Sequence, residues 1–241
     1  MPSAYECKAV VRNLLAHAGI HRYRRLDPLG QFLRRSRVDV VLDVGANSGQ
    51  FGRHLRAMGY RGRIVSFEPL SGAFHKLKAN TATIGQWRAV RLALGDSDET
   101  RTINVAGNSH SSSFLAMLPR HLSAAPTSAY VGTETVTVRR LDGIIDEYCT
   151  AQDRCLLKID VQGFEDAVLR GAQQSLARCV GLQLELSITP LYQGGLMLPQ
   201  MLERLSAEGF TLLDLKPACV DPATGELLQV DGLFSRKRSE A

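Results

Sequence analysis

The amino-acid sequence predicts an α/β protein with a doubly wound, seven-stranded sheet that an antiparallel hairpin closes at its C-terminal end. Short apolar runs alternate with stretches of helical periodicity, which is the pattern of a parallel sheet covered by helices on both faces. The last two apolar runs have no long helix between them, as expected for a hairpin. With 241 residues and 44% hydrophobic side chains, the chain is long enough to bury one such core.

The predicted elements follow one another along the chain. Strands are expected where apolar residues cluster, at 38–44, 64–67, 87–94, 156–161, 180–186, 210–215 and 232–236. Helices are expected at 50–58, 72–80, 141–148, 164–176 and 198–208. The helix at 164–176 is interrupted near Gly171, and the last helix ends before Gly209, a residue typical of helix C-termini.

A segment between the third and fourth strands departs from this alternation. Residues 102–105 and 133–138 alternate like exposed strands, and a serine-rich stretch, 107–128, lies between them. That stretch also carries apolar side chains, which an ordinary surface loop does not need, so we expect it to form a lid over a binding site. The apolar residues are Phe114, Leu115, Met117 and Leu118. The chain is therefore divided into a basic helical extension, 1–37, and a domain, 38–241, with an insertion around 101–138.

The net charge of +5 comes from this N-terminal extension. Residues 1–37 carry eight Lys or Arg side chains against Glu6 and Asp27, so the rest of the chain is close to neutral. This distribution argues against a nucleic-acid groove in the domain. Two interpretations of the extension stay open: contact with anionic lipid headgroups, or a solvated helix whose Arg stems pack on the domain. Apolar spacing predicts one helix over 4–17, and Asp27-Pro28 suits the start of another.

Nothing in the sequence predicts export or a membrane span. No apolar run approaches the roughly 20 residues that cross a bilayer, and charges interrupt the first turns where a secretory signal would be apolar. The five cysteines are scattered, with no Cys-x-x-Cys pair, so neither a disulfide framework nor a metal site is expected. We expect a cytoplasmic protein, and the basic extension leaves residence at the inner face of the membrane open.

The turn after the first predicted strand, Asp43-Val-Gly-Ala-Asn-Ser-Gly49, predicts a cofactor site. Gly45 and Gly49 allow a sharp turn and the close approach of a ligand, and the free N–H groups of the following helix favour an anionic group. Asp43 could attract an amino group, directly or through water. Glu68 ends the second strand, where it can accept hydrogen bonds from both hydroxyls of a ribose.

Asn47 argues against a dinucleotide in this turn. It occupies the position where the Gly-x-Gly-x-x-Gly fingerprint needs a bare backbone beside a pyrophosphate. An NAD-dependent oxidoreductase is therefore disfavoured.

Three further residues belong to the predicted site. Asp96 follows the third strand, where an acidic side chain can meet the adenine amino group, and Asp160 follows the fourth, at the edge where such sheets bind ligands. Ser112 in the insertion could contact cofactor or substrate. Structural roles stay open for all three: a turn cap for Asp96, an ion pair with Lys158 for Asp160, and a flexible loop for Ser112.

Taken together, these segments resemble a known family. The turn at 43–49, Phe67-Glu-Pro69 with 77–80 downstream, and Leu157-Lys-Ile-Asp-Val-Gln-Gly163 followed by Glu165, Val168-Leu169 and Gly171-Ala172 are similar to the motifs of FkbM-type methyltransferases. The likeness covers about residues 38–236. It implies a class I methyltransferase fold, S-adenosylmethionine as methyl donor, and O-methylation, often of a sugar hydroxyl or a polyketide oxygen.

Carried onto this sequence, the resemblance implies which residues form the site. Asp43, Gly45, Asn47, Gly49 and Glu68 would hold the cofactor, and Asp160 would face the reacting centre. Gln162 stands where many members carry Glu. The basic leading segment is similar to that of actinobacterial enzymes that methylate sugars of cell-envelope glycolipids, so the expected acceptor is a glycolipid or a similar small molecule.

A sugar hydroxyl is a poor nucleophile near neutral pH, so a positioned base is expected to add about 10²–10⁴-fold to the rate. The candidates are His110, Asp160 and Glu185. The unperturbed pKa of an imidazole suits proton acceptance near neutrality, but His110 could equally be a loop histidine without a catalytic role. Glu185 could instead hydrogen-bond the sugar.

Two other functions stay open. The acceptor could be a non-sugar oxygen or an amine, although the Asn/Asp-Pro-Pro-Tyr motif of amino-group methylation is absent. The chain could also be a non-catalytic cofactor-binding protein at the membrane surface, against which the intact set of acidic residues argues.

Overall fold

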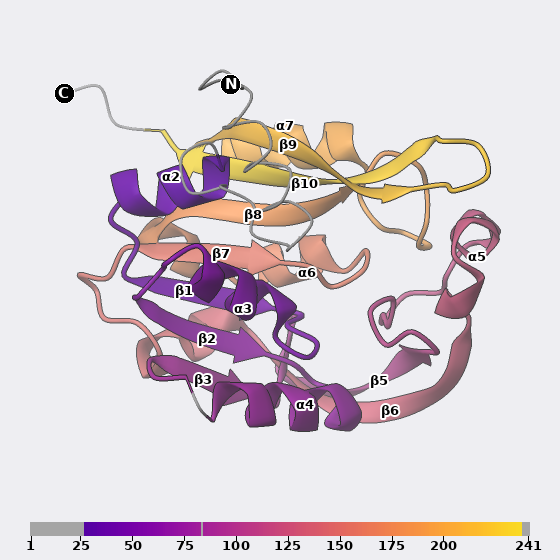
Figure 1. Cartoon of the computed structure of the whole chain (residues 1–241), viewed down its shortest axis with the longest axis horizontal. Coiled ribbons are helices and arrows are strands. Elements are labelled where there is room, and N and C mark those ends of the chain that lie inside the picture. Colours follow the sequence, from indigo (N-terminus) through magenta and orange to yellow (C-terminus); the bar gives the residue numbers. More distant parts are fainter. Residues whose placement is uncertain (1–26, 83, 238–241) are drawn as a thin grey trace, which may run out of the picture.

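A seven-stranded sheet forms the centre of the computed structural model, which describes residues 27–82 and 84–237 (Figure 1). Its strands are β1 (Val40–Val44), β2 (Arg63–Phe67), β3 (Trp87–Val90), β7 (Cys155–Ile159), β8 (Cys179–Ser187), β9 (Phe210–Val220) and β10 (Leu227–Arg236). They lie in the order β3-β2-β1-β7-β8-β10-β9. The first five pair in parallel, and β10 runs antiparallel to both β8 and β9. The predicted doubly wound sheet with its terminal hairpin is confirmed.

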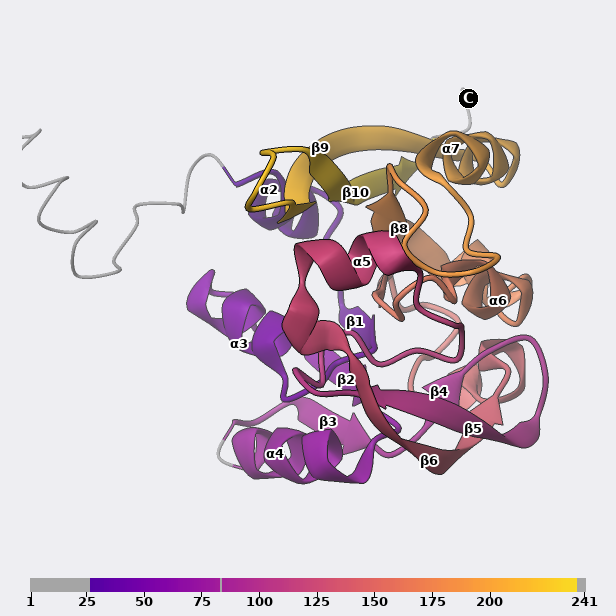
Figure 2. The same ribbon diagram turned by 90° about the vertical axis from the view of Figure 1, so that its right-hand side faces the viewer.

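Helices cover both faces of the sheet (Figure 2). One face carries α2 (Pro28–Arg35), α3 (Gln50–Ala57) and α4 (Ser71–Thr81), and the other carries α6 (Glu165–Arg170) and α7 (Leu198–Ala207). Because β1 and β7 are buried on both faces, their apolar residues run almost without interruption. Val41 packs in the cluster on the first face, and its neighbour Leu42 packs in the cluster on the second.

The first described helix, α2, begins where the Asp27-Pro28 pair predicts. The Asp27 carboxylate accepts a hydrogen bond from the Gly30 N–H at 2.9 Å, which caps the helix. Its other oxygen lies 2.7 Å from Lys216 Nζ on β9, so the same residue joins α2 to the edge of the sheet. The helix expected over 4–17 lies outside the described residues.

The third predicted strand, 87–94, is wrong in its extent. The chain leaves the main sheet after β3, and β4 (Ala93–Leu94) pairs instead with Val138 and Arg139 of β6 (Tyr130–Arg139). Together with β5 (Glu99–Ala106), these strands form a second sheet in the order β4-β6-β5.

Two predicted helices are also shorter than expected. Residues 141–148 form two separate 3₁₀ turns, because Ile144 between them adopts a φ of −131°, outside the helical region. The helix expected over 164–176 ends at Arg170. At Gly171 a Cβ atom would lie 1.8 Å from the Gly95 carbonyl oxygen, so only glycine allows this close contact between α6 and the turn after β4.

The insertion lies at the C-terminal ends of the parallel strands. β5, β6 and the short helix α5 (Pro119–Ala124) extend over this edge, and α5 approaches the turn between β9 and β10 (Figures 1 and 2). This is the edge at which open α/β sheets bind their ligands. Within residues 27–82 and 84–237, no helix is both long and apolar enough to cross a membrane.

Candidate active site

A pocket of about 530 Å³, measured to include space open to solvent, lies at the C-terminal ends of β1, β2 and β7. It therefore occupies the edge that the sequence predicts for the cofactor. Its walls come from the turn after β1, the ends of β2 and β7, the β4 region and the insertion. The lining residues are Val44, Gly45, Asn47, Glu68, Pro69, Leu70, Leu92, Ala93, Leu94, Ile103, Ser109, His110, Ser112, Phe114, Asp160, Val161 and Gln162.

Glu68 lies in the wall of this pocket and is 5% exposed. Its two carboxylate oxygens accept backbone N–H bonds from Leu70 (2.9 Å) and Asn47 (2.8 Å). Burial raises the pKa of Glu68 to about 7, although both N–H groups act in the opposite direction. Each carboxylate oxygen can accept more than one hydrogen bond, so Glu68 keeps acceptor capacity for hydroxyl groups of a ligand in the pocket.

Asn47 joins the turn after β1 to the insertion. Its backbone has a positive φ of 46°, and its Nδ2 donates to the carbonyl oxygen (3.2 Å) and the Oγ (3.1 Å) of Ser109. Its Oδ1 accepts from the Ser48 N–H at 2.8 Å. The same residue thus shapes the turn, binds Glu68 and holds one end of the insertion.

The two glycines allow the sharp turn that the sequence predicts, and they also make close contacts within the protein. Both adopt positive φ, 75° at Gly45 and 87° at Gly49, which favours glycine. However, a Cβ at Gly45 would lie 1.8 Å from the Asp160 carbonyl oxygen, and one at Gly49 would lie 2.9 Å from a Leu77 methyl group. The close approach that requires glycine is therefore between parts of the protein. Gly45 lines the pocket, whereas Gly49 lies behind it as the N-cap of α3.

Asp43 is fully buried and does not line the pocket. Its Oδ2 accepts a hydrogen bond from Ser66 Oγ at 2.8 Å, and Lys158 Nζ lies 3.2 Å from its Oδ1. Lys158 Nζ also lies 3.4 Å from Oδ2 of Asp160, which does line the pocket. Burial alone would lower the pKa of Lys158, but the two carboxylates outweigh it and raise the pKa.

The structure does not place Asp96 with the other predicted cofactor residues. Its Oδ2 accepts hydrogen bonds from Arg170 Nε (3.0 Å) and Nη2 (2.8 Å) on α6, outside the lining of the pocket. The prediction that Asp96 meets the adenine is therefore not supported, because Arg170 occupies its carboxylate. The neighbouring residue Leu94 does line the pocket.

Ser112 lies in the pocket wall, but its hydroxyl is engaged within the insertion. It accepts from the Ala106 N–H at 3.0 Å and donates to the Ser109 carbonyl oxygen at 3.2 Å. These bonds shape the loop that carries His110.

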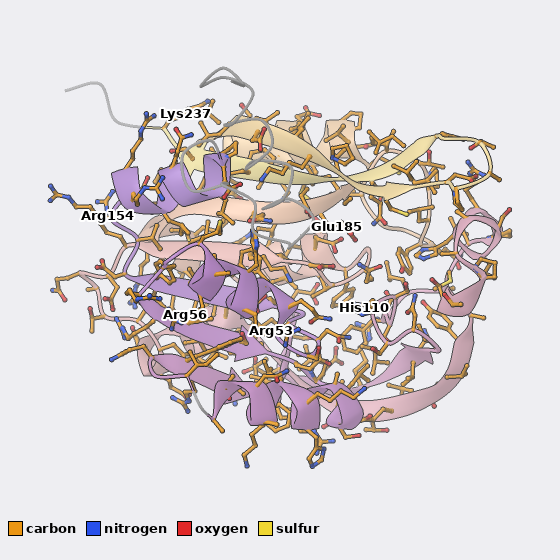
Figure 3. The ribbon with its side chains drawn as sticks, viewed as in Figure 1. Arg53, Arg56, His110, Arg154, Glu185 and Lys237 are labelled. Carbon is orange, nitrogen blue, oxygen red and sulfur yellow. The ribbon has the colours of Figure 1, made fainter. Side chains whose placement is uncertain are left out.

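The three candidate bases lie at the same edge of the sheet. Asp160 and His110 both line the pocket, and His110 is exposed, with its Nε2 3.5 Å from Gln50 Nε2. Figure 3 shows Glu185 near the end of β8 and His110 on the insertion. Burial raises the pKa of Glu185 well above its ordinary value, and nearby carboxylates, first Asp160, add to this effect.

Gln162, which the sequence did not single out as a site residue, connects two of these bases. Its Nε2 donates to Asp160 Oδ1 at 2.8 Å and to Glu185 Oε2 at 2.7 Å. Its Oε1 accepts from the Tyr192 hydroxyl at 2.7 Å. The sequence signals for Gln162 are its position two residues after Asp160 and its place in the motif at 157–163, where many similar proteins carry Glu. Tyr192 lies in a loop that carries no recognisable motif.

The predicted lid residues divide into two groups. Phe114 lines the pocket and packs against Phe164 with ring centroids 4.9 Å apart. Leu115 and Met117 pack instead in a cluster that includes Tyr192. The insertion is also tied to the terminal hairpin, because Arg120 forms ion pairs with Asp221 (2.7 Å) and Glu226 (2.5 Å).

The strand order, the glycine turn after β1 and the carboxylate at the end of β2 together define a class I methyltransferase fold. The family model described as the methyltransferase FkbM domain matches residues 43–212, which is more than half of the chain. The chain belongs to this family. It is a methyltransferase, and its methyl donor is S-adenosylmethionine.

Two curated proteins are similar to this chain. The 2-O-methyltransferase NoeI of Sinorhizobium fredii is 27% identical over 172 residues, which cover 69% of this chain and 70% of NoeI. The AMB antimetabolite synthetase AmbE of Pseudomonas aeruginosa is 29% identical over 177 residues, which cover 61% of this chain and only 8% of AmbE. Among solved structures, a 1,6-didemethyltoxoflavin-N1-methyltransferase of Burkholderia thailandensis has a TM-score of 0.48 and 13% identity, covering 99% of this chain and 92% of that one.

Proposed function

We propose that this methyltransferase acts on a hydroxyl group of a sugar-containing small molecule, such as a cell-envelope glycolipid or a similar secondary metabolite. The observation that carries the proposal is the pair of carboxylates, Asp160 in the pocket wall and Glu185 beside it, that one amide connects at 2.7–2.8 Å. Carboxylates accept protons and hydrogen bonds from hydroxyl groups. The similarity to NoeI, whose name describes a 2-O-methyltransferase, supports an oxygen acceptor.

The residues around the pocket suit the methyl donor. Glu68 has acceptor capacity for the ribose hydroxyls, and the apolar side chains of Leu70, Leu94 and Ile103 suit one end of an adenosine. In this proposal Gly45 and Asn47 hold the methionine part, while Asp43 acts indirectly through its ion pair with Lys158. When bound, S-adenosylmethionine supplies a methyl group on a positively charged sulfur.

The protein's own contribution is to align the acceptor hydroxyl and to take its proton. Alignment is effective, since well-oriented intramolecular reactions reach effective molarities of about 10⁵–10⁸ M. The hydroxyl proton passes to one of the three candidate bases, Asp160, Glu185 or His110, which lie together at this edge. Burial raises the pKa of Glu185 and so increases its affinity for the proton that the hydroxyl group gives up.

The basic extension, 1–37, is proposed as a segment separate in function from the domain at 38–241. A set of Lys and Arg side chains would attract anionic headgroups and bring a glycolipid acceptor close to the pocket. Sedimentation with vesicles of phosphatidylcholine alone or with added phosphatidylglycerol tests this part. Equal binding to both kinds of vesicle would exclude it.

The proposed acceptor is tested by incubating the full chain with methyl-labelled S-adenosylmethionine and a panel of acceptors. The panel contains methyl glycosides, oligosaccharides, glycolipid extracts, amines and non-sugar alcohols, and mass spectrometry locates the new methyl group. We expect label on a sugar oxygen, and much less of it when Asp160→Asn and Glu185→Gln are combined. Label only on an amine or on a non-sugar oxygen would contradict the proposal.

A further inference from the structure

Gln162 lies at the meeting point of the strand end, the lid and the loop before α7. It is 8% exposed and has a φ of 58°, in the left-handed region that residues other than glycine rarely adopt. The next residue, Gly163, also has a positive φ, and a Cβ there would lie 2.8 Å from the Tyr192 side chain. Such a backbone persists only where its surroundings hold it, and it often marks a functional site.

The orientation of the Gln162 amide is fixed by its neighbours. On one side stand two carboxylate oxygens, Asp160 Oδ1 at 2.8 Å and Glu185 Oε2 at 2.7 Å. The NH₂ group faces these oxygens and donates to both, one N–H to each carboxyl group. The amide oxygen then faces the Tyr192 hydroxyl at 2.7 Å, which must donate.

Tyr192 is well suited to hold this amide. It is 3% exposed, and burial raises its pKa, so its hydroxyl keeps its proton. The insertion also contacts Gln162, because Ser113 Oγ donates to the Gln162 carbonyl oxygen at 2.7 Å. Gln162 is therefore held both through its side chain and through its backbone.

Two side-chain amides donate hydrogen bonds to Glu185, and both bonds go to the same carboxylate oxygen. Its Oε2 accepts from Gln162 and also from Gln229 Nε2 on β10, both at 2.7 Å. Its Oε1 makes no hydrogen bond with any residue that the structure describes. One oxygen is thus held in place while the other stays available to a ligand.

We infer that Gln162 is a positioning residue, which holds the Asp160 and Glu185 carboxylates side by side so that the acceptor hydroxyl meets a correctly oriented base, and that Tyr192 in turn orients Gln162. This inference rests on the proposed function. It adds to that function a role for the Gln162 amide. An acidic residue at this position would place a third carboxylate beside Asp160 and Glu185.

The charges around Glu185 set the direction of the expected effect. Asp160, Glu165 on α6 and Asp231 on β10 all disfavour its ionised form, and Lys158 on β7 opposes them. Hydrogen bonds from an amide favour the ionised form of a carboxylate. Removing the Gln162 amide should therefore raise the pKa of Glu185.

The test compares Gln162→Leu and Tyr192→Phe with a matched control, Gln183→Leu. Gln183 lies two residues from Glu185 on β8, and its buried Oε1 has no hydrogen-bond partner among the described residues. The full chain, labelled with ¹³C at Asp and Glu carboxyl groups and saturated with S-adenosylhomocysteine, is titrated by NMR. Spectra of Asp160→Asn and Glu185→Gln assign the two signals.

We expect the Gln162→Leu change to move the Glu185 titration upward by about 1 pH unit, the size of effect expected for a hydrogen bond to a charged group. Tyr192→Phe should give a smaller shift in the same direction, and Gln183→Leu should give none. Unchanged titrations of both carboxyl groups in Gln162→Leu would overturn the inference. If that variant does not fold, an unchanged titration in Tyr192→Phe overturns it instead.

Kinetics give a second readout that separates this inference from the proposed function. With a sugar acceptor, the ascending limb of the pH profile of kcat/KM should move upward in Gln162→Leu. An equal loss at every pH would indicate a merely structural role and would contradict the inference. If the wild-type chain methylates no sugar at all, the proposed function fails, while the NMR titration still decides the role of Gln162.

Discussion

The carboxylate of Asp43 and the ammonium group of Lys158 form a buried ion pair at 3.2 Å, between the first strand of the sheet and the strand beside it. The Asp43 side chain is wholly buried and that of Lys158 is 9% exposed. Because Lys158 also contacts Asp160, this pair connects the centre of the sheet to the pocket wall.

The first prediction concerns the stability of this pair. Lys158→Met leaves the buried Asp43 carboxylate without its counter-charge and should lower the free energy of unfolding by about 3–5 kcal/mol. Asp43→Asn should cost less, because Lys158 keeps its contact with Asp160. The double variant Asp43→Leu/Lys158→Met should lose less than the sum of the two single changes. Urea unfolding measures the free energy of unfolding of each variant. Lys76→Met, at an exposed position of α4, is the control. Strict additivity would show that the pair does not act as a unit.

The second prediction concerns the tether between the cofactor turn and the lid. Asn47→Gly keeps the positive φ but removes both hydrogen bonds to Ser109, so the lid should open more often. We expect faster amide hydrogen exchange over 107–113 and an affinity for S-adenosylhomocysteine that is lower by about tenfold, the value of one to two hydrogen bonds. Unchanged exchange in this segment would contradict the tether.

The third prediction is a pH dependence of cofactor binding that arises from Glu68. Its pKa in the folded chain, about 7, lies above the ordinary 4.5, so the carboxyl group is partly protonated near neutral pH. The ionised form accepts hydrogen bonds from both ribose hydroxyls, and the affinity for S-adenosylhomocysteine should therefore increase as the pH rises from 6 to 8. Calorimetry at several pH values checks this.

Glu68→Gln is the matched variant for that experiment. It should bind more weakly above pH 7 and show a flatter dependence. The same raised pKa stabilises the fold at low pH, a contribution that is lost as the pH rises from about 4.5 through about 7. Burial also raises the pKa of Glu165 to about 7, so the Glu68→Gln variant keeps the pH-dependent stability that Glu165 contributes. A wild-type affinity that falls with rising pH would contradict the role of Glu68.

The fourth prediction separates the candidate bases. His110→Ala, Asp160→Asn and Glu185→Gln are compared for methyl transfer and for binding of S-adenosylhomocysteine. The true base should lose about 10²–10⁴-fold in kcat while keeping its cofactor affinity. If a variant retains full turnover, the residue that it replaces is not the base.

The sequence predicts the sheet well because its signal is local. β1, β7 and β8 lie between helices and are mostly apolar, so each can be recognised without knowing its neighbours. The departure of β4 from the main sheet could not be foreseen in this way. Ala93 and Leu94 are as apolar as a core strand, and only the position of β6 in three dimensions decides their pairing.

The same distinction holds in the site. Glu68 and Asp160 both line the pocket. Each directly follows a parallel strand, and the carboxyl ends of these strands meet at the edge where ligands bind. Asp96 also follows a strand, but its carboxylate forms an ion pair with Arg170, which lies far away along the chain on α6. Tyr192, 30 residues from Gln162 along the chain, carries no motif and is brought to it only by folding.

The most direct test of the central claim is a crystal structure of the full chain with S-adenosylhomocysteine. We expect the ligand in the pocket between the turn at 44–47 and Phe114, with its ribose hydroxyls on the Glu68 carboxylate and its sulfur on the side of Asp160. A ligand bound elsewhere, or one whose ribose does not contact Glu68, would contradict it.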